Sequence, residues 1–348
     1  MFFKNKYKRL AVNEISKISV GISVGDPNGI GIEIILKVFQ DKSLFSFFTP
    51  IVFGHSESLE KESKRMGFKT PIFSLKHLKS PMHDQLNVFN SWSTPFKFKH
   101  GKEEIAAGAA ALSSLYSATE ALKKDQIAAL VTAPIHKKNI QTKYFNFPGH
   151  TDFLNNQLEG KSLMLMISEG LRIALATDHI PIKEITKQLT KESINHKIMI
   201  LFNSLKQDFG IQNPKIAVLG INPHTGDKGV IGDEDDSLLR PLIKQLFDKG
   251  QQVYGPFAAD SFFGSKSYSK YDAILAMYHD QGLIPFKALS FGKGVNFTAG
   301  LNRVRTSPDH GTAFDIAGQG KANESSFREA LFAARSIYFQ RKESETIS

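Results

Sequence analysis

Three histidines stand at equivalent places in the sequence. His179, His224 and His279 each follow a near-continuous apolar run, directly or within a few residues. Ligands of open α/β sheets bind outside the carboxyl ends of the strands, so three imidazoles at three such ends could converge on one point. Neutral imidazoles suit a divalent transition metal and leave coordination positions for a substrate. The pattern predicts a metal site, with separate capping or core histidines as the alternative.

The segment 273–287 shows this pattern most fully. It begins as an apolar run, continues as Tyr-His-Asp-Gln-Gly and ends at Lys287. Burying such groups without partners costs on the order of 2–7 kcal/mol each, so a core strand gains nothing from this ending. We expect Asp178 and Asp280 to orient the adjacent imidazoles as hydrogen-bond acceptors, and Lys287 to reach a substrate.

Other polar residues favour an anionic ligand. His150 and Thr151 follow a proline–glycine turn, and Lys287, Asn296 and Arg305 lie in a later polar stretch. Lysine and arginine are the natural partners of phosphate, and arginine can bind it through two hydrogen bonds. Taken singly, each of these residues is more typical of a surface or structural role. Together their chemistry is compatible with an anionic ligand, including phosphate.

Two glycine-rich segments add less specific signals. Residues 24–33 form a turn from an expected strand into an expected helix, whose N-terminus could hold an anion. This segment lacks both the GxGxxG pattern and the GK[ST] ending of a phosphate-binding loop, and a tight structural turn is an equal alternative. Residues 307–323 are also rich in glycine and carry more polar groups than a simple connection needs.

Apolar runs predict the strands that must position these residues. The runs lie at 17–25, 49–54, 128–134, 162–168, 172–178, 215–221 and 272–278. Runs of this kind suit strands that are buried on both faces. Helical stretches, of which 31–40 and 104–124 are examples, lie between several of them, and the second is rich in small residues suited to close packing. The alternation predicts an α/β fold with a largely parallel sheet.

Composition narrows the functional classes. The 348 residues include no cysteine, which excludes disulfides, cysteine–zinc sites, iron–sulfur clusters and thiol nucleophiles. The net charge is +10, but the lysines are spread out and form no basic stripe interleaved with aromatics. We therefore expect attraction of anionic substrates and no nucleic-acid partner. The start lacks the apolar core of a secretory signal and no run of about 18 apolar residues occurs, so we expect a cytoplasmic protein with no membrane span.

Five segments taken together carry a family resemblance. GDPNGIGIEI, PGHTDFL, GINPHTGDKG, AMYHDQGLIPFK and RTSPDHGTAFDIAG resemble the signature segments of the 4-hydroxythreonine-4-phosphate dehydrogenase family, enzymes of pyridoxal 5′-phosphate (vitamin B6) biosynthesis. They occur in the family's order, and the resemblance extends from about residue 18 to residue 323.

The resemblance implies a fold and an assembly. The family's fold is a two-lobed α/β/α sandwich like that of isocitrate and isopropylmalate dehydrogenases, with a cleft between the lobes. We expect the first lobe, on the nucleotide side, at 1–140 plus 298–348, and the second, with the metal ligands and the dimer interface, at 141–297. The resemblance also implies a homodimer whose active sites are shared between the subunits.

The resemblance further assigns roles to individual residues. The metal ligands are His179, His224 and His279, contributed across the dimer. The substrate and its phosphate are bound by His150, Thr151, Lys287, Asn296 and Arg305. The catalytic base is Asp260 or Lys287, and the residues alone do not choose between them. Residues 310–323 resemble the nucleotide loop of isopropylmalate dehydrogenases, which assigns His310, Gly311, Thr312 and Asn323 to NAD.

The implied reaction is a metal-dependent, NAD-linked oxidation of 4-phosphohydroxy-L-threonine. The product, 2-amino-3-oxo-4-phosphohydroxybutanoate, then loses carbon dioxide and gives 3-amino-2-oxopropyl phosphate. The metal is of the zinc, magnesium or cobalt class, and NADP remains an alternative to NAD. A paralogous dehydrogenase of a phosphorylated sugar acid, such as erythronate or threonate 4-phosphate, is the alternative function. A non-catalytic metal- or phosphate-binding protein is a third possibility, which nicotinamide reduction would exclude.

Some positions depart from the family's usual pattern. Asn28 stands where alanine is common, and Ile32 where proline is common. Asp152 replaces the usual glutamate, and Ile284 takes the place of the usual proline, with Pro285 after it. None of these departures removes a predicted ligand.

Overall fold

The computed structural model describes residues 16–141, 145–147 and 149–347, and the chain divides into two compact units. Unit 1 comprises Met1–Glu159 and Asn302–Tyr338, and unit 2 comprises Gly160–Leu301 and Phe339–Ser348. The expected lobes, 1–140 plus 298–348 and 141–297, keep the whole C-terminal end with the first lobe. In the structure the last residues of the chain belong to unit 2.

The strands of unit 1 form a parallel sheet in the order β3-β4-β2-β1-β5-β12. In chain order they are β1 (Ile18–Ser23), β2 (Phe48–Gly54), β3 (Ile72–Leu75), β4 (Leu86–Asn90), β5 (Ala129–Thr132) and β12 (Arg305–Pro308). The register of β1 on β2 is continuous from Ile18 opposite Phe48 to Ser23 opposite Phe53. All residues of β5 and β12 are buried, as expected for strands covered on both faces.

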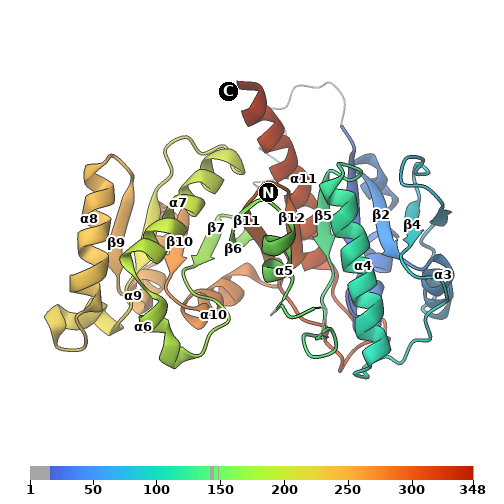
Figure 1. Ribbon diagram of the computed structural model, residues 1–348, viewed down its shortest axis with the longest axis horizontal. Coiled ribbons are helices and arrows are strands. Elements are labelled where there is room, and N and C mark those ends of the chain that lie inside the picture. The colour runs from blue at the N-terminus through green and yellow to red at the C-terminus, as the bar shows by residue number, and fades with distance from the viewer. Residues whose placement is uncertain (1–15, 142–144, 148, 348) are drawn as a thin grey trace. The chain divides into compact units, whose positions relative to one another are not determined.

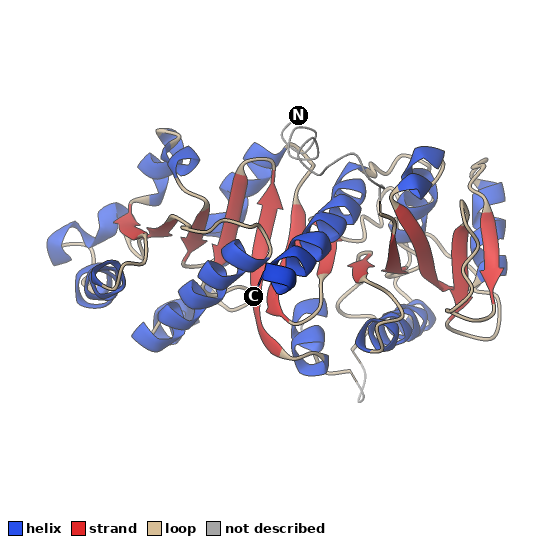
Figure 2. Cartoon of the chain, turned by 90° about the horizontal axis from the view of Figure 1, so that it is seen from above, coloured by secondary structure: helices blue, strands red, loops and turns tan. Residues whose placement is uncertain are grey.

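Helices lie on both faces of the unit 1 sheet (Figure 2). They are α2 (Gly31–Val38), the 3₁₀ helix η2 (Lys42–Ser46), α3 (Ser56–Arg65), α4 (Ile105–Lys123), α5 (His150–Gln157) and the first part of α11 (Ser325–Ile347). The long helix α4 packs on β1, β2 and β5 (Figure 1). A Cβ added at Gly108 of α4 would lie 1.9 Å from the carbonyl oxygen of Asn139. The small residues of this helix therefore do permit the close packing that the sequence predicts.

The strands of unit 2 form a mixed sheet in the order β11-β6-β7-β10-β8-β9. They are β6 (Gly160–Ser168), β7 (Leu171–Leu175), β8 (Ile216–Leu219), β9 (Val253–Phe257), β10 (Ala273–Ala276) and β11 (Val295–Leu301). Strand β6 is antiparallel to both of its neighbours, whereas β7, β10, β8 and β9 are parallel. The prediction of a largely parallel α/β fold is confirmed, and β6 is the exception to the parallel order.

Unit 2 also contains helices and short helical turns. These are η3 (Ile182–Glu184), α6 (Ile185–Gln188), α7 (Lys191–Gln207), η4 (Pro223–Gly229), η5 (Asp235–Leu239), α8 (Arg240–Asp248), α9 (Ala259–Gly264), η6 (Ser267–Lys270), α10 (His279–Ser290) and the end of α11. A buried cluster joins the sheet to α9 and α10 through residues such as Leu175, Ile274, Phe262 and Phe286. This core fixes the helix that begins at His279. None of the helices in the described part of the chain is long and apolar enough to cross a membrane.

Candidate active site

One edge of the unit 2 sheet carries the histidines that follow its strands. Strands β7, β10 and β8 are parallel neighbours, so their carboxyl ends lie at the same edge. His179 follows β7, His224 follows β8, and His279 is the first residue of α10, just after β10. The ring centroids of His179 and His279 are 5.6 Å apart. The fold thus brings two of the three predicted imidazoles together.

The first turn of α10 explains how His279 reaches this place. A Cβ added at Gly282 would lie 2.7 Å from a methyl carbon of Leu175 and 3.0 Å from the Cβ of Ala276. Glycine in a helix interior costs about 0.5–1 kcal/mol relative to alanine, and here it permits the helix to lie directly on β7 and β10. The side chain of Gln281 accepts a hydrogen bond from the Met277 N–H and donates one to the Gly220 carbonyl, each at 2.7 Å. Gln281 therefore ties the ends of β10 and β8 to each other.

The two neighbouring carboxylates behave differently. Oδ1 of Asp280 lies 2.7 Å from Nδ1 of His279, which is the orientation contact that the sequence predicts. Oδ1 of Asp178 accepts a hydrogen bond from the backbone N–H of His179 at 2.6 Å and stands 4.0 Å from Nδ1 of that ring. Asp280 thus engages one ring nitrogen and leaves Nε2 for a metal ion, as in many protein metal sites. Asp178 holds the backbone instead of the ring.

His224 lies in an unusual turn. Residues 224–229 all have positive φ, from 43° to 89°, so η4 contains a left-handed stretch in which only Gly226 and Gly229 are glycines. The carboxylate of Asp235 supports the entry to this turn, because it accepts hydrogen bonds from the N–H groups of Ile221 and Asn222, each at 2.9 Å. The left-handed conformation costs a residue other than glycine roughly 1–2 kcal/mol. Contacts such as those of Asp235 must therefore offset the strain of this turn.

The three-histidine set is not assembled within the described part of one chain. Among residues 16–141, 145–147 and 149–347, no three His, Cys, Asp or Glu side chains form a group that could hold a metal ion. The nature of the donors and the orientation of His279 do suit a divalent transition metal. The assignment of His224 as a third ligand remains a prediction.

A buried guanidinium is the main feature of the predicted substrate residues in unit 1. Arg305, the first residue of β12, is 2% exposed, and its Nε and one terminal nitrogen donate to the hydroxyl of Thr132 at 3.1 and 2.6 Å. Burial lowers the pKa of Arg305 to about 9. The guanidinium nevertheless remains positively charged near neutral pH. Thr132 is not among the predicted site residues. A threonine at the end of a buried apolar strand is nevertheless a recognisable sign of a polar contact at that strand end.

His150 and Thr151 begin helix α5 in the same unit. Nε2 of His150 is buried and has no hydrogen-bond partner among the described residues. Burial lowers the pKa of His150 well below 6.5, and the positive charges of Arg305 and Lys137 lower it further. The N-terminus of a helix, which favours negative charge, thus lies among positively charged groups. This arrangement favours an anion, and Lys137 is a contributor that the sequence analysis missed.

The remaining predicted substrate and base residues belong to unit 2. Lys287 is exposed on α10, and Asp260 is exposed in the first turn of α9. Asn296 lies on β11, where its buried Oδ1 has no hydrogen-bond partner among the described residues. Nothing in these placements favours Asp260 over Lys287 as the base.

The predicted nucleotide residues lie in the loop between β12 and α11 in unit 1. Nδ1 of His310 is 3.1 Å from the Gly311 carbonyl oxygen, and its buried Nε2 has no partner among the described residues. A Cβ added at Gly311 would meet nothing within 4 Å, so space is open beside the backbone. The carbonyl of Thr312 accepts a hydrogen bond from the Ile30 N–H at 3.0 Å, and Oδ1 of Asn323 accepts one from the Ser325 N–H at 2.8 Å. A buried unpaired nitrogen and open backbone suit a polar cofactor.

The glycine-rich segment 24–33 is a structural turn. Every residue of this segment is buried, and the carboxylate of Asp26 accepts hydrogen bonds from the Asn28 N–H and the Asn139 amide. Burial raises the pKa of Asp26, although both hydrogen bonds oppose that shift. The side chain of Asn28 in turn contacts the backbone of Lys99 and Lys102. The N-terminus of α2 is therefore covered by protein, which favours the structural turn over the anion site for this segment.

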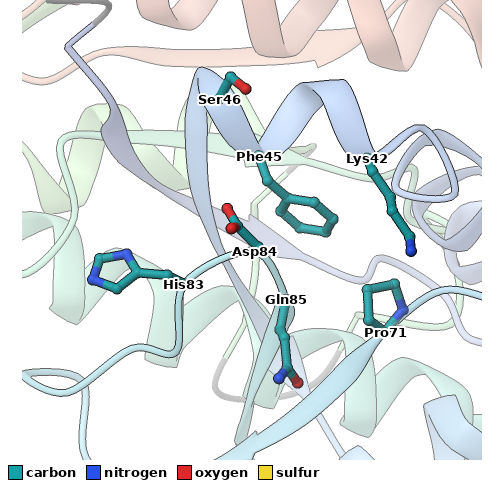
Figure 3. Close-up of a pocket in the computed structure, with 7 residues that line it drawn as sticks. All are labelled: Lys42, Phe45, Ser46, Pro71, His83, Asp84 and Gln85. Carbon is teal, nitrogen blue, oxygen red and sulfur yellow. The ribbon is translucent and has the colours of Figure 1, made fainter.

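A hollow of about 410 Å³ opens elsewhere in unit 1 (Figure 3). Its lining residues are Lys42, Phe45, Ser46, Pro71, His83, Asp84 and Gln85, and none of them is a predicted site residue. Asp84 already forms an exposed ion pair with Lys17 at 3.2 Å. The hollow thus contains both signs of charge and no buried polar group that lacks a partner.

Comparisons with known proteins agree with the sequence motifs. The model of the family described as pyridoxal phosphate biosynthetic protein PdxA matches residues 46–334. The 4-hydroxythreonine-4-phosphate dehydrogenase of Bacteroides thetaiotaomicron is 45% identical, over 94% of this chain and 91% of that protein. The crystal structure of the enzyme of that name from Klebsiella pneumoniae is 32% identical, has a TM-score of 0.79 and covers 94% of this chain and 99% of its own.

A more distant structure shows the range of substrates on this fold. A terephthalate 1,2-cis-dihydrodiol dehydrogenase from Burkholderia xenovorans is 26% identical, has a TM-score of 0.61 and covers 92% of this chain and 98% of its own. The matched dehydrogenases are oxidoreductases, and this chain is an enzyme of that class. By motif order, by family model and by identity over most of its length, the chain belongs to the PdxA family of pyridoxal phosphate biosynthetic proteins.

Proposed function

We propose that this enzyme oxidises 4-phosphohydroxy-L-threonine with NAD as the hydride acceptor. The product would be 2-amino-3-oxo-4-phosphohydroxybutanoate, a β-keto acid that loses carbon dioxide to give 3-amino-2-oxopropyl phosphate. The observation that carries the proposal is the buried positive charge of Arg305 beside the neutral ring of His150 at the start of α5. Relatives with up to 45% identity are named for a phosphorylated substrate of this kind.

The residues of unit 1 suit the phosphate. A guanidinium can form two parallel hydrogen bonds to a phosphate group, and a helix N-terminus adds backbone donors. The unpartnered Nε2 of His150 is a further polar group for the anion to engage. In this proposal Thr151 contributes its hydroxyl, and the remote phosphate provides binding energy that positions the reacting carbon.

The residues of unit 2 suit the chemistry at the hydroxyl group. A divalent metal bound by His179 and His279, with His224 of a second subunit, would supply Lewis acidity to the hydroxyl oxygen. Asp280 engages Nδ1 of His279 at 2.7 Å, so Nε2 would be the nitrogen that binds the ion. Asp260 or Lys287 takes the hydroxyl proton, and Asn296 contacts the substrate through its buried amide. We accordingly propose a homodimer with shared active sites.

The loop of His310, Gly311, Thr312 and Asn323 is the proposed nicotinamide site. A bound nicotinamide supplies the hydride acceptor. The unpartnered Nε2 of His310 and the open space beside Gly311 support this assignment. This loop would hold the acceptor for the hydride from the reacting carbon, and Asp260 or Lys287 would take the hydroxyl proton.

A substrate panel tests the proposal. Metal-loaded enzyme would be mixed with NAD and either 4-phosphohydroxy-L-threonine, erythronate 4-phosphate or a terephthalate cis-dihydrodiol, with NADH absorbance as the readout. We expect NADH only with the first compound at a substantial rate. Turnover of the sugar acid in its place would support the paralogous function, and no NADH with any of the three would contradict the proposal.

A further inference from the structure

An ion pair on α2 binds the backbone of the loop at residues 310–323, the proposed nucleotide loop. Neither residue of the pair belongs to the predicted nucleotide site. Glu33 and Lys37 are four residues apart on α2, with Lys37 Nζ 3.2 Å from Oε1 of Glu33. The Lys37 ammonium donates to the carbonyls of Gly320 and Ala322, each at 2.7 Å. The Glu33 carboxylate accepts from the N–H groups of the same two residues, at 3.2 and 2.8 Å. One ion pair thus satisfies four backbone groups in a loop more than 280 residues away.

The burial of this ion pair strengthens its hydrogen bonds to the loop backbone. The side chain of Glu33 is 1% exposed and that of Lys37 is 16% exposed. Charge-assisted hydrogen bonds in such surroundings are roughly twice as strong as neutral ones. A water-exposed loop of glycines would otherwise sample many conformations, since glycine loses more freedom on ordering than any other residue. The pair fixes the backbone directly before Asn323.

A second ion pair, on helix α3, contacts the same loop. Arg65 donates two hydrogen bonds to Glu62 at 2.9 and 2.6 Å, and one terminal nitrogen also donates to the Gly318 carbonyl at 3.0 Å. His100 lies 2.9 Å from Glu62 through Nε2, and a Cβ at Gly318 would lie 2.5 Å from its ring. Alternate residues of the loop, 318, 320 and 322, are therefore each held by charged side chains.

We infer that Glu33 and Lys37 are positioning residues for the nicotinamide cofactor, acting through the backbone of residues 320–322. The inference rests on the proposed function, because it assumes that this loop binds NAD. Neither side chain needs to touch the cofactor. By ordering the loop before binding, the pair lowers the entropy cost of association and so the KM for NAD.

The test is a kinetic comparison of wild type with Lys37→Met. We expect the KM for NAD to rise about tenfold, the loss expected for a charged donor to a backbone carbonyl. The kcat at saturating NAD and the KM for the phosphorylated substrate should stay within about twofold, because neither reports loop ordering. An unchanged KM for NAD, or an equal change in all three parameters, would overturn the inference.

Two control variants separate positioning from general destabilisation. Lys61→Met removes a lysine that pairs with Glu57 four residues earlier on α3 and is largely exposed. Arg341→Met removes a buried cation that pairs with Asp208 and donates to the Leu301 carbonyl in unit 2. Both should leave the KM for NAD unchanged. A rise in the Arg341→Met variant equal to that of Lys37→Met would mean that lost stability alone explains the effect.

A double variant and a binding measurement cover the cases in which the kinetic comparison alone would not decide. If Lys37→Met does not fold, Glu33→Gln/Lys37→Met leaves no uncompensated buried charge and should show the same rise in KM for NAD. Calorimetric titration of NAD into the metal-loaded enzymes separates the two claims. Binding to wild type with equal affinity for the variant overturns this inference alone, whereas no binding to wild type overturns the proposed cofactor and this inference with it.

Discussion

The predicted site residues of the two units are held in different ways. In unit 1, Arg305 is 2% exposed and bonded to Thr132, and residues 320–322 are held by the largely buried ion pair of Glu33 with Lys37. In unit 2, the side chains of His179 and His279 are 41% and 37% exposed at the edge of the sheet. Folding of the chain alone completes the cationic site, whereas the histidine edge supplies oriented ligands that an ion would join. In the proposed reaction, the residues of unit 1 hold the phosphate and the nucleotide, and the histidine edge of unit 2 holds the metal ion.

Loss of an edge histidine should give the largest effect. We expect His279→Ala to lower metal-dependent NADH formation by at least about 100-fold, more than is typical for a residue that merely orients a ligand. His196→Ala is the matched control, because His196 is an exposed histidine on α7 with no proposed role. Near-normal activity of His279→Ala would contradict a metal-binding role for this histidine.

Loss of the buried guanidinium should come next and should act on substrate binding. We expect Arg305→Met to raise the KM for the phosphorylated substrate by about 100-fold, since buried charged hydrogen bonds are worth about 1.5–3 kcal/mol each. Arg305→Lys should restore little, because a lysine cannot reproduce two-point binding of phosphate. Arg303→Met is the control. Arg303 lies two residues before Arg305 and forms an ion pair with Asp125 that is more exposed to water. A KM equal to that of the control would contradict the anion site.

The carboxylates of the histidine edge sharpen the comparison within unit 2. Asp280→Asn should weaken metal affinity about 10- to 100-fold, as loss of a ligand-orienting carboxylate usually does. Asp178→Asn should weaken it less, because Asp178 binds the backbone of His179. Metal affinity would be measured by competition with a chromophoric chelator. Equal effects of the two variants would show that the contact of Asp280 with the ring has no special role.

The smallest expected effect concerns pH and unit 1. Because the pKa of His150 is lowered below 6.5 in the folded protein, the unfolded chain binds a proton that the folded protein does not as pH falls below about 6.5. The free energy of unfolding should therefore decline by up to about 1.4 kcal/mol per pH unit until the lowered pKa is reached. His150→Gln should show a shallower decline in urea denaturation, and His196→Gln should follow wild type. Parallel curves for all three proteins would contradict a buried neutral His150.

The sequence predicts the strands that are long and apolar, and it misses those that are buried for other reasons. All seven apolar runs contain strands in the structure. Strand β12 has the sequence Arg-Thr-Ser-Pro, which contains no strand-favouring pattern, yet every residue in it is buried. Its burial comes from pairing with β5 across a large separation in sequence, which local patterns do not encode. Edge strand β3 is short and half-exposed, and it likewise gives little periodic signal.

The same limit applies to the site. The strand-end position of His279 could be predicted because the apolar run before it is continuous. The support from Gly282 and Asp280 follows from adjacent residues and is readable once the helix is placed. By contrast, the contacts of Thr132 with Arg305 and of Lys37 with Gly320 join residues far apart in sequence. Such contacts become visible only when the chain is folded.

The most direct test of the central claim is a metal titration of NADH formation. Metal-free protein, prepared with a chelator, would be mixed with NAD and 4-phosphohydroxy-L-threonine and titrated with zinc, magnesium or cobalt, in wild type, His279→Ala and His196→Ala. We predict saturable restoration of activity in wild type and His196→Ala and none in His279→Ala. Full activity of the metal-free wild type, or equal restoration in His279→Ala, would contradict a metal centre at the edge of unit 2.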